Sequence, residues 1–419
     1  MKAMRVFFLS VMGLSCAFAL GCGGGSSSSA NSSTPPPNTI TTTGTNVAAI
    51  AVNGGPLGNY SDAAFISVTV CTPGTTTCQT VPNILVDTGS SGLRIISSLL
   101  TVSLPQQKAS DGNPVAECLQ FLGSYTWGPV QTADVQISGE KASSVPIQVL
   151  SDNTAGFATP TSCSDPSGTL ESSADTVALL GAYGILGVGT YAQDCGIATA
   201  PVCQASYNVY YECPSTGCIP TNQQLAQQVT NPVALFATDN NGVIVELPSV
   251  AAGGQASATG SLVFGIGTQS NNALGSATVY SIDYTTGNFS TTFNSATDES
   301  FLDTGSNGYY FQDNSLAQCT DAQGFYCPTT PVNLTATNQG TAYQGTPTGS
   351  GTVNFTIGNA DTLFSAGNAL SELGGTVVTD GSSPANYFDW GLPFFFGRNV
   401  YVAIQGATAP GGTTPYWAY

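Results

Sequence analysis

Ile84-Leu85-Val86-Asp87-Thr88-Gly89-Ser90-Ser91-Gly92 is repeated in the second half of the chain as Ser300-Phe301-Leu302-Asp303-Thr304-Gly305-Ser306-Asn307-Gly308. A bare Asp-Thr-Gly would arise by chance roughly one time in four in a chain of this composition. Requiring two apolar residues before it, Ser after it and Gly two positions further on lowers that expectation to about one in two thousand. Two copies therefore indicate an internal duplication rather than two unrelated turns.

A second pair of segments supports the duplication. Gly184-Ile185-Leu186-Gly187-Val188-Gly189 follows the first copy, and Asp389-Trp390-Gly391-Leu392-Pro393 follows the second. Each half of the chain thus has an Asp-Thr-Gly loop and, further on, an apolar segment that ends in glycine. We expect two related lobes.

The composition excludes several kinds of chemistry. The 419 residues include 24 Asp plus Glu, 6 Lys plus Arg and no histidine. Without imidazole there can be no Ser-His-Asp or Cys-His nucleophile and no His-rich zinc site, so acid-base chemistry must rely on carboxylates. Such an acidic chain is a poor partner for nucleic acid or an anionic membrane surface.

The same composition predicts an all-β protein. Gly 49 and Pro 24 accompany a charged fraction of only 7%, so good surface helix formers are scarce. Alternating or apolar runs predict strands at 64–70, 84–86, 134–137 and 145–150. A short helix is expected at 222–229, where Gln, Leu and Ala are concentrated.

The N-terminus is typical of an exported protein. Lys2 and Arg5 precede an apolar run from Val6 to Leu20, which is too short for a comfortable membrane span. Ala19-Leu20-Gly21-Cys22 resembles the lipobox of bacterial lipoproteins, which predicts a signal peptide at 1–21 and lipidation of Cys22; an ordinary signal peptide with an incidental Cys is the alternative. Residues 22–46 are predicted to form the lipidated Cys and a Gly/Ser/Thr/Pro tether. By resemblance to the lipoprotein sorting pattern, Gly23 favours the outer membrane.

Ten of the 12 cysteines remain once Cys16 and Cys22 are set aside. In an oxidising compartment an even number favours disulfides, although connectivity cannot be deduced from sequence. Metal binding is the alternative, with no His and no paired CxxC spacing to support it. Short separations favour four pairs and leave a fifth: Cys71 with Cys78, Cys195 with Cys203, Cys213 with Cys218, Cys319 with Cys327, and Cys118 with Cys163.

The chain resembles the pepsin-like aspartic endopeptidases in its two Asp-Thr-Gly loops and in Ile185-Leu186-Gly187. Further likeness lies in Asn231-Pro232-Val233-Ala234-Leu235-Phe236, in Gly260-Ser261-Leu262-Val263-Phe264-Gly265 and in the stretch from Gly391 to Val402, so it spans about 47–405. The resemblance implies a bilobal double β-barrel with a cleft between an N-terminal lobe at 47–250 and a C-terminal lobe at 251–419.

The resemblance also implies roles for the repeated residues. Asp87 and Asp303 would share a proton and activate a water molecule against a peptide bond. Positioning roles fall to the residues that follow each aspartate: Thr88, Gly89, Ser90, Thr304, Gly305 and Ser306. We expect a peptide or protein substrate, a monomer, contact with a membrane through the N-terminal lipid only, and no metal or cofactor.

Three features depart from the family pattern. Arg94 stands where a Trp would support the flap; it is either a buried cation that disturbs the shared proton or an exposed or backbone-bonded arginine. A flap hairpin is expected around Phe121, Tyr125 and Trp127, although these aromatic side chains could equally pack on the lobe. Asp389 occupies an apolar place in the second apolar-Gly segment.

These observations predict a lipid-anchored aspartic endopeptidase. The alternative is a non-catalytic envelope lipoprotein that binds a peptide or glycan in the cleft. A third hypothesis, a β-rich structural or adhesion lipoprotein whose Asp-Thr-Gly loops are mere turns, requires the two aspartates to lie more than about 10 Å apart, where no proton can be shared.

Overall fold

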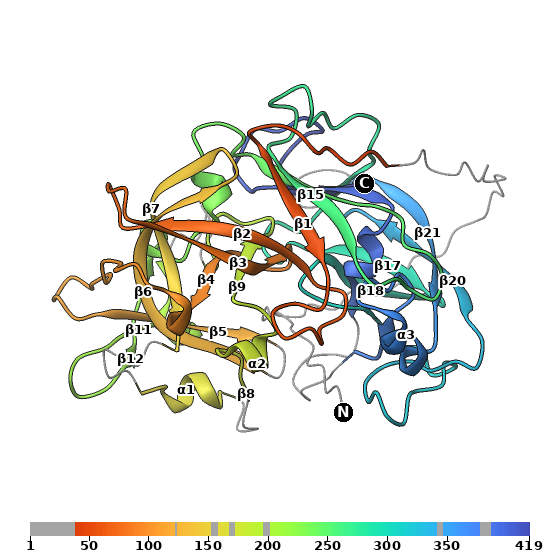
Figure 1. Ribbon diagram of the computed structural model, residues 1–419, viewed down its shortest axis with the longest axis horizontal. Coiled ribbons are helices and arrows are strands. Elements are labelled where there is room, and N and C mark those ends of the chain that lie inside the picture. Colours follow the sequence, from red (N-terminus) through yellow and green to blue (C-terminus); the bar gives the residue numbers. More distant parts are fainter. Residues whose placement is uncertain are drawn as a thin grey trace.

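The computed structural model describes residues 38–121, 124–151, 158–166, 172–195, 202–341, 347–377 and 387–419. The predicted signal peptide, Cys22 and the tether up to residue 37 lie outside the described residues. Figure 1 shows two β-rich lobes, one formed mainly by the first half of the chain and the other mainly by the second half.

The first lobe is built on a closed ring of strands. Each strand pairs with the next and the last pairs with the first, in the order β2 (Ala64–Cys71), β3 (Cys78–Asp87), β9 (Gly184–Val188), β4 (Ser91–Ile96), β7 (Glu140–Leu150) and β6 (Ser124–Ile137). Apolar side chains such as Val86, Ile95 and Ile147 fill its interior and are fully buried. Alternation along the strands directs these side chains inward.

A smaller layer extends this barrel beyond β6. Its strands are β5 (Val115–Phe121), β11 (Tyr210–Glu212), β12 (Ile219–Pro220) and β8 (Ser172–Ser173). β5 and β6 form an antiparallel hairpin, β11 pairs with the free side of β5, and β8 pairs with β6. The hairpin is therefore flanked by other strands on both sides. Nearby are α1 (Thr161–Ser164), α2 (Val177–Leu180) and the strand pair β10 (Val202–Cys203) and β13 (Gln223–Gln224).

Six strands continue from β2 and join the two lobes. They are β1 (Val47–Val52), β15 (Ala258–Phe264), β14 (Gly242–Leu247), β24 (Arg398–Ala403), β25 (Tyr416–Ala418) and β16 (Val279–Ser281). Of the predicted tether, residues 38–46 already contact this sheet: Thr41 bonds to Glu246 and Ser261, and buried Asn46 donates to the carbonyl of Phe264.

The second lobe contains a seven-stranded sheet. Its order is β21 (Ser350–Ile357), β20 (Val332–Gln339), β17 (Phe289–Phe293), β18 (Ala296–Asp303), β23 (Tyr387–Gly391), β19 (Tyr309–Tyr310) and β22 (Gly374–Gly375), and α3 (Ala360–Ala366) packs beside it. Its core is aromatic: Phe388 stacks on Phe311 and on Trp390. These large rings fill a lobe that the open sheet alone does not enclose.

The all-β, two-lobed prediction is confirmed, as are the four predicted strands. The helix expected at 222–229 is wrong: this stretch contains β13 and one 3₁₀ turn, Leu225–Gln227. Eight residues are too few for a helix to persist without tertiary support, and Gln228 instead returns its side chain to the carbonyl of Gln223. Other 3₁₀ turns lie at Ser97–Leu99, Ala205–Tyr207, Pro232–Leu235 and Leu392–Phe395.

The five predicted disulfides are all present. They join Cys71 to Cys78, Cys118 to Cys163, Cys195 to Cys203, Cys213 to Cys218 and Cys319 to Cys327. Within the described ranges, no helix has the length and apolar character needed to cross a membrane.

Candidate active site

The first Asp-Thr-Gly loop lies between two strands that share a neighbour. Asp87 ends β3, which runs parallel to β9 and pairs Asp87 with Gly187. β4 leaves the loop and pairs antiparallel with the same strand, so that Gly92 also faces Gly187. A Cβ at Gly187 would come within 2.6 Å of the Ser91 nitrogen. The glycine that ends the apolar segment is thus required by the close approach of the loop.

The second loop has the same construction. Asp303 ends β18, which runs parallel to β23 and pairs Asp303 with Gly391. β19 leaves the loop and pairs antiparallel with β23. A Cβ at Gly391 would lie 2.1 Å from the carbonyl oxygen of Gly308. The two copies of the sequence pattern therefore adopt matching structures, one in each lobe.

Hydrogen bonds between the two threonines fasten the loops together. The backbone N–H of Thr88 donates to the Thr304 hydroxyl at 3.1 Å, and the Thr304 N–H donates to the Thr88 hydroxyl at 3.0 Å. Each hydroxyl then donates to a carbonyl of the opposite lobe, that of Leu302 or of Val86, at 2.7 Å. These four buried hydrogen bonds satisfy both hydroxyls and both amides.

Each aspartate is held by its own loop in the same way. The N–H of Gly89 donates to Oδ1 of Asp87 at 2.8 Å, and the Ser90 hydroxyl donates to Oδ2. In the second lobe the N–H of Gly305 donates to Oδ1 of Asp303 at 2.7 Å, and the Ser306 hydroxyl donates to Oδ2, also at 2.7 Å. Four of the six predicted support residues thus bond to the carboxyl groups, whereas Thr88 and Thr304 bond across the lobes.

The two carboxyl groups lie close together between the lobes, on either side of the position where Gly305 would carry a side chain. A Cβ built on Gly305 would lie 2.7 Å from Oδ1 of Asp87 and 3.0 Å from Oδ1 of Asp303. Asp87 is 6% exposed and Asp303 5%. Burial raises the pKa of Asp303 well above its usual value, and the charge of Asp87 together with a hydrogen bond to it raises this pKa further. Such proximity excludes the hypothesis that the loops are independent turns.

The aromatic residues expected in a flap lie in the β5–β6 hairpin, and their rings pack within the first lobe. Phe121, at the end of β5, is buried beside Leu85 and Ile185. Trp127 meets Tyr211 edge-on, with ring centroids 5.1 Å apart, and Tyr125 belongs to the same buried cluster.

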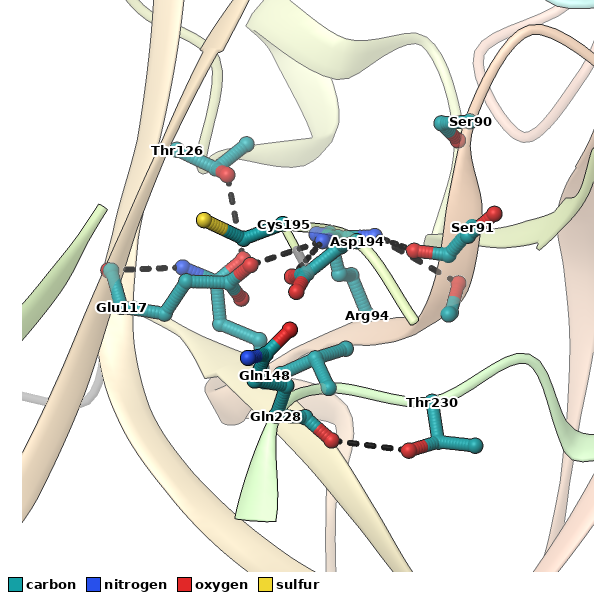
Figure 2. Close-up of polar contacts among 12 residues, drawn as sticks. Ser90, Ser91, Arg94, Glu117, Thr126, Gln148, Asp194, Cys195, Gln228 and Thr230 are labelled. Carbon is teal, nitrogen blue, oxygen red and sulfur yellow. Dashed lines mark hydrogen bonds and ion pairs between the residues drawn. The ribbon is translucent and has the colours of Figure 1, made fainter. Parts of the chain in front are cut away.

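Arg94 is fully buried and paired with two carboxylates. Its Nη2 lies 2.8 Å from Oε1 of Glu117 and 2.9 Å from Oδ2 of Asp194 (Figure 2). Burial alone would lower the Arg94 pKa, but the charges of Glu117 and Asp194 raise it above its usual value. The expected alternative is an exposed or backbone-bonded arginine: exposure is wrong, whereas a backbone bond is present, from Nη1 to the Ser91 carbonyl at 2.9 Å. The groups that shift the pKa of Asp303 are Asp87, Ser306 and Gly305, in addition to burial.

Tyr60 and Asp62, which lie between β1 and β2, interact with the second lobe in ways that the sequence pattern does not predict. Burial, and then the charge of Asp303, raises the pKa of the Tyr60 hydroxyl. Asp62, with a positive φ of 51°, accepts a hydrogen bond from the Leu370 N–H at 2.7 Å and so ties the segment between β1 and β2 to the second lobe. Only the tertiary fold brings this segment to the second lobe.

Asp389 is buried beneath the second loop. Neither of its carboxylate oxygens has a hydrogen-bond partner among the described residues. Burial raises its pKa well above the usual value and the charge of Asp303 raises it further; nearby Ser306 lowers it but directs its hydrogen to Asp303.

Metal ligands do not gather at this site in the described part of the chain. The one group with suitable spacing there is Cys319, Cys327 and Asp361. Its two cysteines form a disulfide, so their sulfur atoms are not thiolates and cannot serve as ordinary zinc or iron ligands.

The site thus belongs to a two-lobed β protein with one carboxyl group contributed by each lobe. The chain belongs to the family described as "Protein of unknown function (DUF3443)", whose model matches residues 42–419. No curated protein matches the sequence. Solved structures similar to it include the aspartic proteinase from Irpex lacteus, with a TM-score of 0.48 and 16% sequence identity over 89% of this chain and 96% of that chain.

Proposed function

We propose that the protein is an aspartic endopeptidase whose catalytic residues are Asp87 and Asp303. The observation that carries this proposal is the pair of buried carboxyl groups, one from each lobe, held by matching hydrogen bonds. Two carboxyl groups this close share a proton, and one acid with one base is what hydrolysis by water requires.

In the first step Asp303 holds the shared proton and Asp87 is the base. Asp87 takes a proton from water as the water oxygen attacks the peptide carbonyl carbon, and Asp303 gives its proton to the carbonyl oxygen, forming a gem-diol. In the second step Asp87 gives its proton to the nitrogen, the C–N bond breaks, and Asp303 takes a proton from a gem-diol hydroxyl. The products are an amine and a carboxylic acid, and both aspartates regain their starting protonation states. Ser90 and Ser306 keep the outer oxygens oriented throughout.

A peptide library tests this proposal without assuming a substrate. The purified, disulfide-bonded full-length protein is incubated with the library from about pH 3 to 7, beside Asp87→Asn, Asp303→Asn and the exposed control Asp321→Asn. We expect cleavage products from the wild type and from Asp321→Asn, and none from either dyad variant. A folded wild type that yields no products contradicts the proposal.

We also propose that the protein is exported and anchored through lipidated Cys22, with the outer membrane as its location. The sequence from Met1 to Cys22 and the five disulfides support export to an oxidising compartment. Metabolic labelling with palmitate, followed by membrane fractionation, should label the wild type and not Cys22→Ser. An unlabelled wild type contradicts lipidation.

A binding protein that retains the cleft is the second candidate. The observation that favours it is the hairpin β5–β6, whose movement is restricted by β11, β8 and the Cys118–Cys163 disulfide. A peptide or glycan would then be held without being cleaved. Recovery of bound but intact peptides from the library by the wild type distinguishes this function from hydrolysis.

A further inference from the structure

The guanidinium group of Arg94 joins three segments of the first lobe. Nη1 donates to the carbonyl of Ser91 at 2.9 Å and, at 3.5 Å, to that of Gly92, on the strand that leaves the Asp87 loop. Nη2 donates to Glu117 on β5 and to Asp194, which follows β9 (Figure 2). The three charged side chains are at most 2% exposed. One buried group thus connects the dyad loop to the hairpin.

Hydrogen bonds also hold the backbone of Glu117 and the carboxylate of Asp194. The carbonyl of Glu117 accepts a hydrogen bond from the Gln148 side chain at 2.8 Å, and Gln148 accepts one from Thr126 at 3.0 Å (Figure 2). The Tyr210 hydroxyl donates to Oδ1 of Asp194 at 2.7 Å. Because β5, β6 and β7 all contribute to this cluster, the position of Arg94 is coupled to the whole base of the hairpin.

Stability alone does not explain a buried ion cluster here. Replacing buried ion pairs by apolar side chains is often neutral or stabilising, since desolvation offsets the attraction between charges. An apolar side chain cannot donate to the Ser91 and Gly92 carbonyls, however, and it cannot fix the direction of the Glu117 carboxylate. The cluster provides orientation that packing would not.

We propose that Arg94 is a positioning residue that fixes the β5–β6 hairpin against the strand leaving the Asp87 loop, and so shapes the peptide-binding side of the first lobe. This inference rests on the proposed endopeptidase function. Arg94 does not touch the reacting carboxyl groups; it acts through Glu117 on one side and the Ser91 and Gly92 carbonyls on the other.

Three variants of the full-length protein test this role. Arg94→Met removes the charge and all donors, whereas Glu117→Gln keeps an acceptor for Arg94 but loses the charge. Lys141→Met is the matched control, because it breaks an ion pair of the same lobe, with Asp134 at 3.1 Å, in which Lys141 is exposed. Hydrogen exchange of the amides of β5 and β6 and separate KM and kcat values are measured for each variant and the wild type.

For Arg94→Met we expect hairpin amides to exchange at least about tenfold faster and KM to rise about tenfold, with kcat within about threefold of wild type, since binding and not the dyad is affected. In Glu117→Gln the hairpin exchange rate and KM should rise by smaller factors. In Lys141→Met neither should change. If Arg94→Met does not fold, the hairpin exchange and the KM of Glu117→Gln test the inference in its place.

Unchanged hairpin exchange in both Arg94→Met and Glu117→Gln would overturn the inference, as would a loss of kcat at constant KM. If the wild type cleaves no peptide, the proposed function fails separately, and the exchange measurement still decides whether Arg94 holds the hairpin.

Discussion

Asp389 occupies in the second lobe the place that Ile185 occupies in the first. Each lies two residues before the glycine that pairs with a dyad aspartate, since Leu85 pairs with Ile185 and Phe301 with Asp389. Ile185 packs in an apolar cluster, whereas Asp389 is fully buried with both oxygens unpartnered among the described residues. The two otherwise matching supports therefore differ by one buried carboxyl group.

Asp389→Leu should stabilise the protein. An unpartnered buried polar group costs about 1–3 kcal/mol, and leucine restores the apolar character found at Ile185. We expect the free energy of unfolding at pH 7 to rise by about that amount in urea titrations. Asp321→Leu, at an exposed position, is the control and should change it by less than about 0.5 kcal/mol. A destabilised Asp389→Leu variant would mean that the carboxyl group makes a needed contact.

Stability should fall as the pH rises from mildly acidic to neutral. Burial raises the pKa values of four aspartates well above the usual value: Asp62, Asp194, Asp303 and Asp389. Above about pH 4, where these groups ionise in the unfolded chain, the folded protein binds more protons, so the free energy of unfolding decreases with pH up to the raised pKa values. Asp134, whose pKa is lowered, contributes stability that is lost only as the pH falls below about 4, outside this window.

Urea midpoints of the wild type at pH 4.5 and 7.5, chosen to fall inside this window, measure the effect. Asp389→Leu should show a smaller difference between the two values, because it removes one of the contributing groups. Equal midpoints in the wild type would contradict the prediction.

Gly305→Ala should lower activity about a hundredfold while leaving most of the fold intact. The added methyl group would press on Oδ1 of Asp87 and displace the carboxyl groups, and a displacement of about 1 Å can cost about a hundredfold in rate. Gly308→Ala is the control, because there the nearest atom would be 3.4 Å away. Steady-state rates and far-UV circular dichroism of both variants check this; a fully active Gly305→Ala enzyme would show that the close approach is unnecessary.

Thr304→Val should weaken the junction between the lobes. Valine has nearly the same shape but leaves the Thr88 N–H and the Val86 carbonyl without their buried partner. We expect a loss of about 1–3 kcal/mol in the free energy of unfolding. The control is Thr335→Val, since Thr335 bonds to Asn354 on an exposed face. If both variants lose the same amount, the buried hydrogen bonds are not what joins the lobes.

The sequence by itself determined the features that depend on local chemistry. The repeated Asp-Thr-Gly loops and their apolar-Gly partners identified both carboxyl groups, because a loop that tight needs glycine and a strand end at fixed positions. Four disulfides followed from cysteines at most eight residues apart, and the fifth from the two that remained.

Only the tertiary structure decided what surrounds those loops. Arg94 has partners 23 and 100 residues away, and Asp62 has one 308 residues away, so no local pattern could reveal them. The lone segment at 222–229 had helical composition but lacked the length to form a helix without packing. Burial, which sets the pKa values of Asp303 and Asp389, is likewise a property of the whole fold and not of the neighbouring sequence.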